Sequence, residues 1–170
     1  MKWDKGLDFE STYNKLVQIA LVTNRETTKA YSLILLLQLR NGARISEAVR
    51  AFKVWLSNPS KKEVEIRVSK KKKEESRLME IPKEFLKFNI KDFEWVKDVE
   101  EKDLIDRVKT FAFRNKINTH SLRYSFVTYL LKKGINPSIV AKITHHSNLN
   151  YILTYTQQKE AEKALREVNK

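Results

Sequence analysis

Separate segments of the chain carry arginine, histidine and tyrosine at spacings that could bind and attack a phosphate group. Arg44 follows closely after a helix-breaking glycine, and His120 and Arg123 lie three residues apart, so that both share one face of a helix. Tyr155 follows His146 by nine residues. A guanidinium stays charged and binds anionic oxygens bidentately, an imidazole titrates near neutral pH, and a tyrosine hydroxyl can act as a nucleophile. Together these groups could carry out phosphodiester chemistry without a metal ion.

Each of these segments alone also has an ordinary structural explanation. Arg44 could form an ion pair with Glu47 at i+3, which contributes only ~0.3 kcal/mol. Tyr155 lies three residues after Ile152 and could be a core or interface aromatic. A run of four lysines at 70–73 is typical of a solvated turn. It is the order and spacing of all the segments together that favour an active site.

The elements that must position these residues are mostly helical. Apolar residues recur at helical spacing in the first third and in the second half of the chain. The run at 33–37 makes its helix apolar almost all round, so we expect that helix at the centre of the core. Helices are predicted around 11–21, 27–41, 47–51, 82–88, 101–116, 122–133, 137–143 and 149–153, followed by a polar, helix-prone tail.

The middle of the chain changes to a period of two. Val64, Ile66 and Val68 alternate with charged residues, the segment 78–81 can pair with them, and the lysine run lies at the turn between the two strands. A further short strand is predicted at 54–56. We therefore expect a mainly α fold with a small antiparallel β-sheet (α+β), and the lack of an internal repeat or linker predicts a single domain over residues 1–170.

The motifs resemble those of the tyrosine recombinase family, which includes phage and archaeal-virus integrases. The segment 43–47 (ARISE) resembles the family's first box, 120–134 (HSLRYSFVTYLLKKG) its second, and 146–156 its third. The resemblance extends from about residue 11 to 158 and implies the catalytic-domain fold of that family. Two positions depart from the pattern: His145 stands where the family usually has glycine, and Tyr124 stands where the second box often has histidine.

The resemblance implies a role for each candidate residue. Tyr155 would attack the phosphorus and form a 3′-phosphotyrosyl bond, while Arg44 and Arg123 would hold the non-bridging oxygens. His120 would act as general base or proton shuttle. His146 would donate a hydrogen bond to a phosphoryl oxygen.

A lysine of the hairpin would protonate the departing 5′-oxygen. Lys70 is favoured because it directly follows the alternating strand, but Lys71, Lys72 or Lys73 could serve instead. His145 could compete with its neighbour at 146, although the nine-residue spacing to the tyrosine favours the latter. The sequence holds no glycine-rich phosphate loop and no carboxylate cluster of the kind that binds Mg²⁺, so no metal, ATP or other cofactor is expected.

The charge of the chain favours a polyanionic partner. The net charge is +13, from 34 Lys+Arg against 21 Asp+Glu, and nucleic acid is the commonest partner of so basic a protein. A lysine-rich solvated surface or an anionic membrane surface are the alternatives, but no apolar run approaches the ~20 residues that span a bilayer. With no cysteine and no signal peptide, we expect a cytoplasmic protein that binds double-stranded DNA and has no membrane partner and no small-molecule substrate.

Other readings of the same motifs remain open at this stage. A type IB topoisomerase or a telomere resolvase would use the same active site, and a non-catalytic DNA-binding protein could retain the fold. The resemblance also implies a monomer in solution that assembles into a tetramer on paired DNA sites. The family's usual N-terminal DNA-clamping domain is expected to be absent from residues 1–170.

Overall fold

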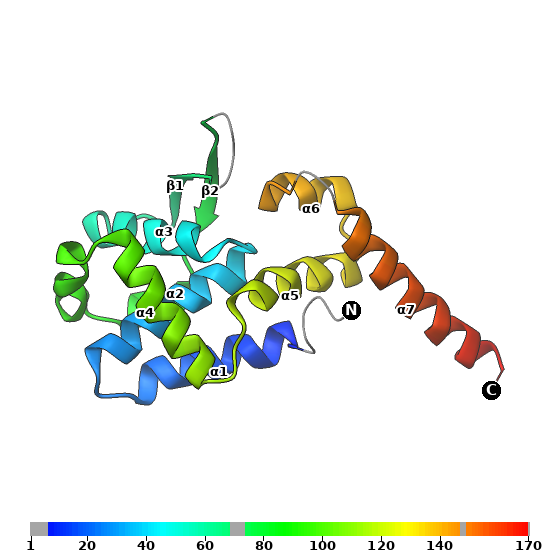
Figure 1. Cartoon of the computed structure of the whole chain (residues 1–170), viewed down its shortest axis with the longest axis horizontal. Helices are drawn as coiled ribbons and strands as arrows, with labels where there is room; N and C mark the ends of the chain where they lie inside the picture. Colours follow the sequence, from blue (N-terminus) through cyan, green and yellow to red (C-terminus); the bar gives the residue numbers. More distant parts are fainter. Residues whose placement is uncertain (1–6, 69–73, 147–148, 170) are drawn as a thin grey trace.

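The computed structural model describes residues 7–68, 74–146 and 149–169, without the side chains of 151, 152, 155, 156 and 159. These ranges form a mostly helical protein with one two-stranded antiparallel sheet, which confirms the predicted α+β class (Figure 1). Within them, no helix is both long and apolar enough to cross a bilayer. In chain order the elements are α1 (Phe9–Val22), α2 (Glu26–Asn41), α3 (Ile45–Ser57), β1 (Glu63–Arg67), β2 (Ser76–Glu80), the 3₁₀ helices η1 (Lys83–Lys87) and η2 (Ile90–Asp98), α4 (Glu101–Arg114), α5 (Thr119–Lys132), α6 (Pro137–Thr144) and α7 (Asn150–Val168).

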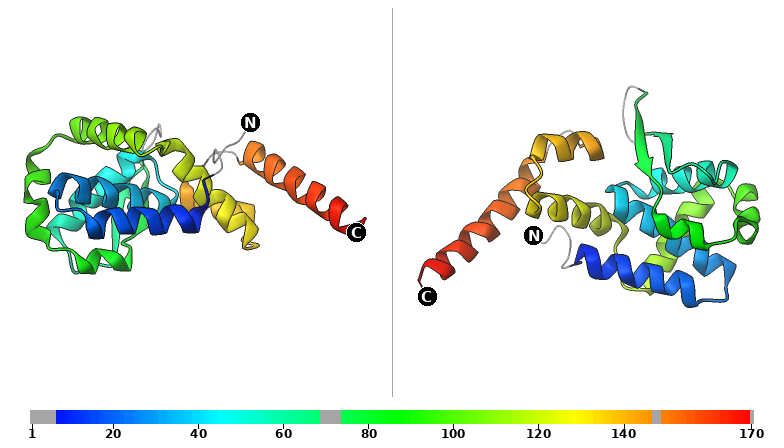
Figure 2. Two further views of the ribbon diagram at one scale, coloured as in Figure 1. Left: turned by 90° about the horizontal axis from the view of Figure 1, so that it is seen from below. Right: turned by 180° about the vertical axis from the view of Figure 1, so that it is seen from behind.

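Helix α2 is the centre of the hydrophobic core. Its residues 33–37 are completely buried, because α1, α3, α4 and α5 all pack against it. Figure 2 shows α1 lying along α2 on one side of the molecule. Burying a leucine or isoleucine side chain contributes about 1.5–3 kcal/mol, so this run is a main source of stability. The structure confirms the central position predicted for this helix.

A left-handed turn at Gly42 joins α2 to α3. Gly42 has a φ of 59°, and its N–H donates to the carbonyls of Gln38 and Leu39, as in other helix ends capped by glycine. A Cβ at this position would lie 2.2 Å from Cδ1 of Phe126 on α5 and 2.9 Å from Cγ2 of Thr144. Glycine therefore allows both the backbone turn and the close approach of α5 to it.

The hairpin of β1 and β2 is attached to the end of α2. Arg77 of β2 lies opposite Ile66 of β1, and both side chains face the body of the protein. The side chain of Asn41 pairs with the backbone of Glu80, donating from Nδ2 to its carbonyl at 2.9 Å and accepting its N–H at 2.8 Å. The position of the hairpin is therefore tied to the α2–α3 turn.

The short strand predicted at 54–56 is wrong. These residues form the last turns of α3, in which Phe52, Trp55 and Leu56 are buried at helical spacing. Trp55 packs edge-on against Phe85, with a distance of 4.8 Å between ring centroids. The helix predicted after Pro82 is present, but as the short 3₁₀ helix η1.

The last three helices extend from the core toward the C-terminus. Helix α5 packs against α2, while α6 and α7 both pack against α5. In Figures 1 and 2, α7 projects away from the remaining helices, and the two strands stand beside α6. This arrangement leaves the loop after α6 close to the α2–α3 turn, where the candidate residues meet.

Candidate active site

Three of the six predicted residues come together between the α2–α3 turn and the loop after α6. Arg44 is the N-cap of α3, Arg123 lies in the middle of α5, and His146 directly follows the C-cap of α6. His120 lies one turn before Arg123 on α5. Tyr155 belongs to α7, but its side chain lies outside the described part of the structure. The lysines at 70–73, with the favoured Lys70, also lie outside the described residues.

The arginines gather around one buried carboxylate, that of Glu47 in the first turn of α3. Its Oε1 accepts the backbone N–H of Arg44 at 3.0 Å, and its Oε2 lies 3.3 Å from Nη1 of the same residue. Nη1 of Arg77 donates to Oε1 at 3.3 Å, and Nη1 of Arg123 lies 3.7 Å from this oxygen. Because three guanidinium groups face one carboxylate, the cluster keeps an excess of positive charge.

Arg123 is held in place by neutral acceptors as well. Its Nη1 donates to the carbonyl of Gly42 at 3.2 Å, its Nη2 to the carbonyl of Thr144 at 3.0 Å, and its Nε to Nε2 of His146 at 3.1 Å. Burial, followed by the positive charge of Arg44, lowers the pKa of Arg123 to about 10. The guanidinium is still protonated at neutral pH, so it is a fixed positive charge at a buried position.

His146 is neutral in this arrangement. Its Nδ1 lies 2.6 Å from Oγ1 of Thr144, whose hydroxyl donates to the carbonyl of Val140 at 3.0 Å. The Thr144 oxygen must therefore accept from Nδ1–H, which leaves Nε2 unprotonated to accept from Arg123. Burial, and then the charge of Arg123, lowers the pKa of His146 to about 3. In this state the ring orients a guanidinium.

His145 points to the hairpin. It is the C-cap of α6 with a φ of 58°, a conformation that glycine adopts freely and histidine only at a cost. Its Nδ1 lies 3.1 Å from Oε2 of Glu75, next to the start of β2. The geometry therefore favours His146 over His145 as the histidine of the arginine cluster.

His120 and Tyr124 form a second, more exposed group beside the cluster. Nε2 of His120 lies 3.4 Å from the hydroxyl of Tyr124, and their rings meet edge to face with centroids 5.2 Å apart. The Tyr124 ring in turn stacks on that of His146 at a centroid distance of 6.4 Å. Tyr124, which departs from the family pattern, therefore bridges the two candidate histidines.

Sequence reasoning missed two members of the site. The sequence places Glu47 in the first box and suggests it only as an i+3 ion-pair partner of Arg44, yet it is completely buried and contacts three arginines. Arg77 is not singled out by any motif. The sequence could have indicated Arg77 through the alternation of β2, because Arg77 lies two residues before Met79 and so on the same inward face of the strand.

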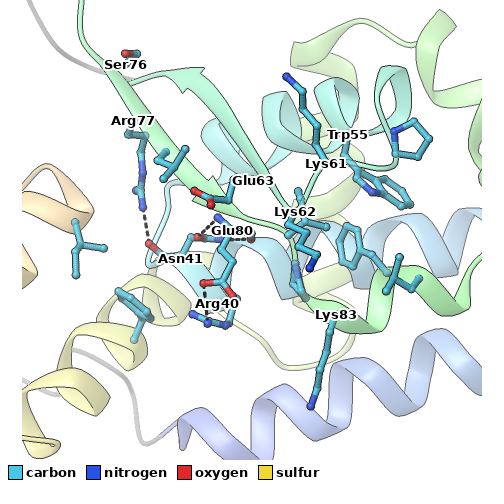
Figure 3. Close-up of a pocket in the computed structure, with 18 of the residues that line it drawn as sticks. Arg40, Asn41, Trp55, Lys61, Lys62, Glu63, Ser76, Arg77, Glu80 and Lys83 are labelled. Atoms are coloured by element: carbon cyan, nitrogen blue, oxygen red, sulfur yellow. Dashed lines mark hydrogen bonds and ion pairs between the residues drawn. The ribbon is translucent and has the colours of Figure 1, made fainter.

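A cavity of about 1010 Å³ adjoins the cluster between the hairpin, η1 and α6 (Figure 3). The cluster and the cavity share Arg77, whose guanidinium in Figure 3 points toward the carbonyl of Asn41. The other basic residues that line the cavity are Arg40, Lys61, Lys62, Lys83 and Lys142. Glu63 and Glu80 are its acidic lining residues. The charged residues of this cavity are mostly basic, beside many apolar ones, and this excess of positive charge next to an arginine cluster suits a polyanion whose backbone continues past one bound phosphate.

Comparison with known proteins gives a consistent result. Residues 10–162 match the model of the phage integrase family. "Putative integrase ORF241" of Acidianus two-tailed virus is 39% identical over 173 residues, which cover 98% of this chain and 68% of the relative. An uncharacterised protein of Methanocaldococcus jannaschii is 35% identical, over 98% of this chain and 88% of its own length.

More distant relatives agree with these. "Putative integrase V10" of the Sputnik virophage is 33% identical over 76% of this chain and 67% of its own length. A protein named tyrosine recombinase, from Thermosipho africanus, is 30% identical over 42% of this chain and 22% of the relative. No solved structure matches the chain with statistical significance.

Proposed function

The chain belongs to the phage integrase family, and we propose that it is a site-specific DNA recombinase that cleaves and rejoins DNA through a 3′-phosphotyrosyl intermediate. Membership of this family, with relatives named integrase and tyrosine recombinase, implies DNA binding, recombination and integration. The proposal assigns the cleavage and rejoining to residues of this chain.

The observation that carries the proposal is the excess positive charge around Glu47. A phosphodiester has one negative charge, whereas the pentacoordinate transition state of its displacement has two. Guanidinium groups already fixed by Glu47 and by backbone carbonyls therefore stabilise the transition state more than the ground state. Removing one such preorganised donor typically slows a reaction roughly 10²–10³-fold.

Tyr155 is the proposed nucleophile. Its phenolic oxygen forms a bond to phosphorus while the bond from phosphorus to the 5′-oxygen breaks. His120 accepts the phenolic proton, and Lys70, or one of the three lysines after it, gives a proton to the departing 5′-oxygen. The 5′-hydroxyl of another strand then attacks the phosphotyrosine and releases the phenol, which exchanges the strands. Since the covalent bond conserves the phosphodiester energy, the cycle requires no nucleotide hydrolysis.

His146 changes partner in this scheme. In the DNA-free protein its unprotonated Nε2 accepts from Arg123, so it has no proton there for a phosphoryl oxygen. A phosphate beside Arg123 raises the pKa of His146 from about 3, because its negative charge offsets the arginines that now lower it. The ring then takes up a proton and donates to the phosphate.

The proposed substrate is double-stranded DNA, bound by monomers that assemble into a tetramer on paired sites. The net charge of +13 supports an affinity that is dominated by phosphate contacts. Light scattering should give the mass of one chain without DNA and of four chains on a pair of sites. A stable oligomer in the absence of DNA would contradict this assembly.

The catalytic proposal is tested with nicked DNA duplexes in EDTA. Cleavage beside a nick releases a short fragment that cannot religate, so a covalent adduct accumulates and survives SDS. We expect the adduct with the wild-type chain and with Tyr151→Phe, a matched control on α7, but not with Tyr155→Phe. If no variant forms an adduct although DNA binding is intact, the protein is a non-catalytic binder.

A further inference from the structure

Arg77 has no part in the reaction scheme above, yet it is as buried as Arg123. Both side chains expose about 3% of their surface or less. Burying an arginine is unfavourable unless its charge is paired and its donors are used. A strand facing the core would ordinarily place an apolar side chain there, as β2 does at Met79. The guanidinium of Arg77 therefore needs an explanation from its contacts.

These contacts connect three elements. Nη1 of Arg77 donates to Oε1 of Glu47 on α3 at 3.3 Å, and Nη2 donates to the carbonyl of Asn41 at the end of α2 at 2.7 Å. Its Nε has no hydrogen-bond partner among the described residues. Because Asn41 also binds the backbone of Glu80, strand β2 is fixed at two points, Arg77 and Glu80, against the α2–α3 turn.

Arg77 and Arg123 use equivalent acceptors. Arg77 binds the carbonyl of Asn41 and Arg123 binds that of Gly42, which are consecutive groups at the negative end of the α2 dipole. Both also approach Oε1 of Glu47, at 3.3 Å and 3.7 Å. Losing Arg77 would leave this oxygen to Arg123 and to the backbone of Arg44, so the carboxylate and both arginines would shift together.

We infer that Arg77 is a positioning residue of the active site, which holds Glu47 and the Asn41 carbonyl so that Arg44 and Arg123 present their guanidinium groups in fixed positions. It also ties the hairpin, which carries the candidate general-acid lysines, to the same carboxylate. The inference rests on the proposed function, because the arginines it positions are those that would bind the scissile phosphate. Arg77 acts through Glu47, since only about 3% of its own surface is exposed.

The test compares adduct formation at saturating nicked DNA with the dissociation constant for the same duplex. Arg77→Met should slow adduct formation by about 10- to 100-fold, as expected when catalytic groups shift by about 1 Å, and should leave the dissociation constant within about threefold. The rate of adduct formation by Arg77→Lys should lie between those of the wild type and Arg77→Met. A lysine keeps the charge, but its single ammonium lacks the forked donors with which a guanidinium binds both Glu47 and the Asn41 carbonyl. The matched control is Arg67→Met, which removes the same charge from an exposed position on β1 of the same hairpin. It should leave the saturated rate unchanged.

A double-mutant cycle with Glu47 separates positioning from loss of stability. If Arg77 acts through Glu47, the variant with Glu47→Gln and Arg77→Met should react no more slowly than the slower single variant. This double variant removes both partners of the Arg77–Glu47 ion pair, and Arg44 and Arg123 lose the same carboxylate as they do in Glu47→Gln alone. Thermal unfolding of every variant, followed by circular dichroism, fixes an assay temperature at which all are folded.

The possible outcomes are distinct. Three results would overturn the inference and leave the proposed function standing. The double variant could be slowed by the product of the two single effects, Arg77→Met could form the adduct as fast as the wild type, or Arg77→Met could change only the dissociation constant for DNA. A wild-type chain that forms no adduct would refute the proposed function, and the positioning role with it.

Discussion

Substituting Gly42 by alanine tests how the α2–α3 turn holds the arginine cluster. The residue has a φ of 59°, and an alanine in this left-handed region costs about 1–2 kcal/mol. The new Cβ would also lie 2.2 Å from Cδ1 of Phe126, which is 4% exposed, so this ring or α5 would have to shift. Overpacking of this kind typically costs a further ~1–3 kcal/mol.

The free energy of unfolding should therefore fall by roughly 2–5 kcal/mol in Gly42→Ala, which is a large part of the total stability of most domains. At about 2–4 °C per kcal/mol for a chain of this size, Tm should fall by roughly 4–20 °C. Chemical and thermal unfolding followed by circular dichroism measure both quantities. Thr144, which the new Cβ also approaches to 2.9 Å, contacts Arg123 and His146, so cleavage should weaken even where the variant is folded.

Gly134 provides the matched control. It also has a positive φ, of 83°, but a Cβ there would have no heavy atom within 4 Å among the described residues. Gly134→Ala should therefore show the backbone cost of ~1–2 kcal/mol without the steric cost. If Gly42→Ala is no more destabilising than Gly134→Ala, the packing of α5 against the turn does not have the role assigned to it here.

Three further predictions concern the histidines and the surface charge. His145→Gly should raise the free energy of unfolding by up to ~1 kcal/mol, because relief of the positive φ outweighs an exposed pair with Glu75, and a lower Tm would contradict this. His146, with a pKa lowered to about 3 from 6.5, binds a proton more readily when unfolded, so it stabilises the fold fully above pH 6.5 and loses this contribution as the pH falls to 3. In His146→Gln the free energy of unfolding should therefore change less with pH between 6.5 and 3 than in the wild type. An unchanged pH dependence would show that His146 is not held neutral. The dissociation constant for DNA should rise steeply with salt concentration. In a plot of its logarithm against the logarithm of the salt concentration, the slope should be smaller by about one for each phosphate-binding lysine removed, for example with Lys62→Ala on the cavity wall.

The parts of the fold with strong periodicity were predictable from the sequence. The apolar run at 33–37 requires a helix that is surrounded on all sides, and the alternation around Ile66 requires a strand with one buried face. The segment 54–56 could not be assigned in this way. Its apolar residues are equally compatible with a short strand, and only their packing with Phe52 and Phe85 decides for a helix.

The candidate site was predictable where a motif names the residue and not where burial gives it its role. The motifs indicate Arg44, Arg123 and His146, and the structure brings these three together. The roles of Glu47 and Arg77 depend on long-range contacts between α3, β2 and α5, which local sequence does not encode. The functional roles of all six predicted residues stay predictions until cleavage is measured.

The most direct test of the central claim is to identify the amino acid that becomes joined to DNA. The adduct formed on a nicked duplex is digested with protease and nuclease, and the peptide that carries a nucleotide is sequenced by mass spectrometry. We expect a single modified residue, Tyr155, linked to a 3′-phosphate, with a free 5′-hydroxyl on the released strand. Attachment to another residue, or linkage to a 5′-phosphate, would contradict it.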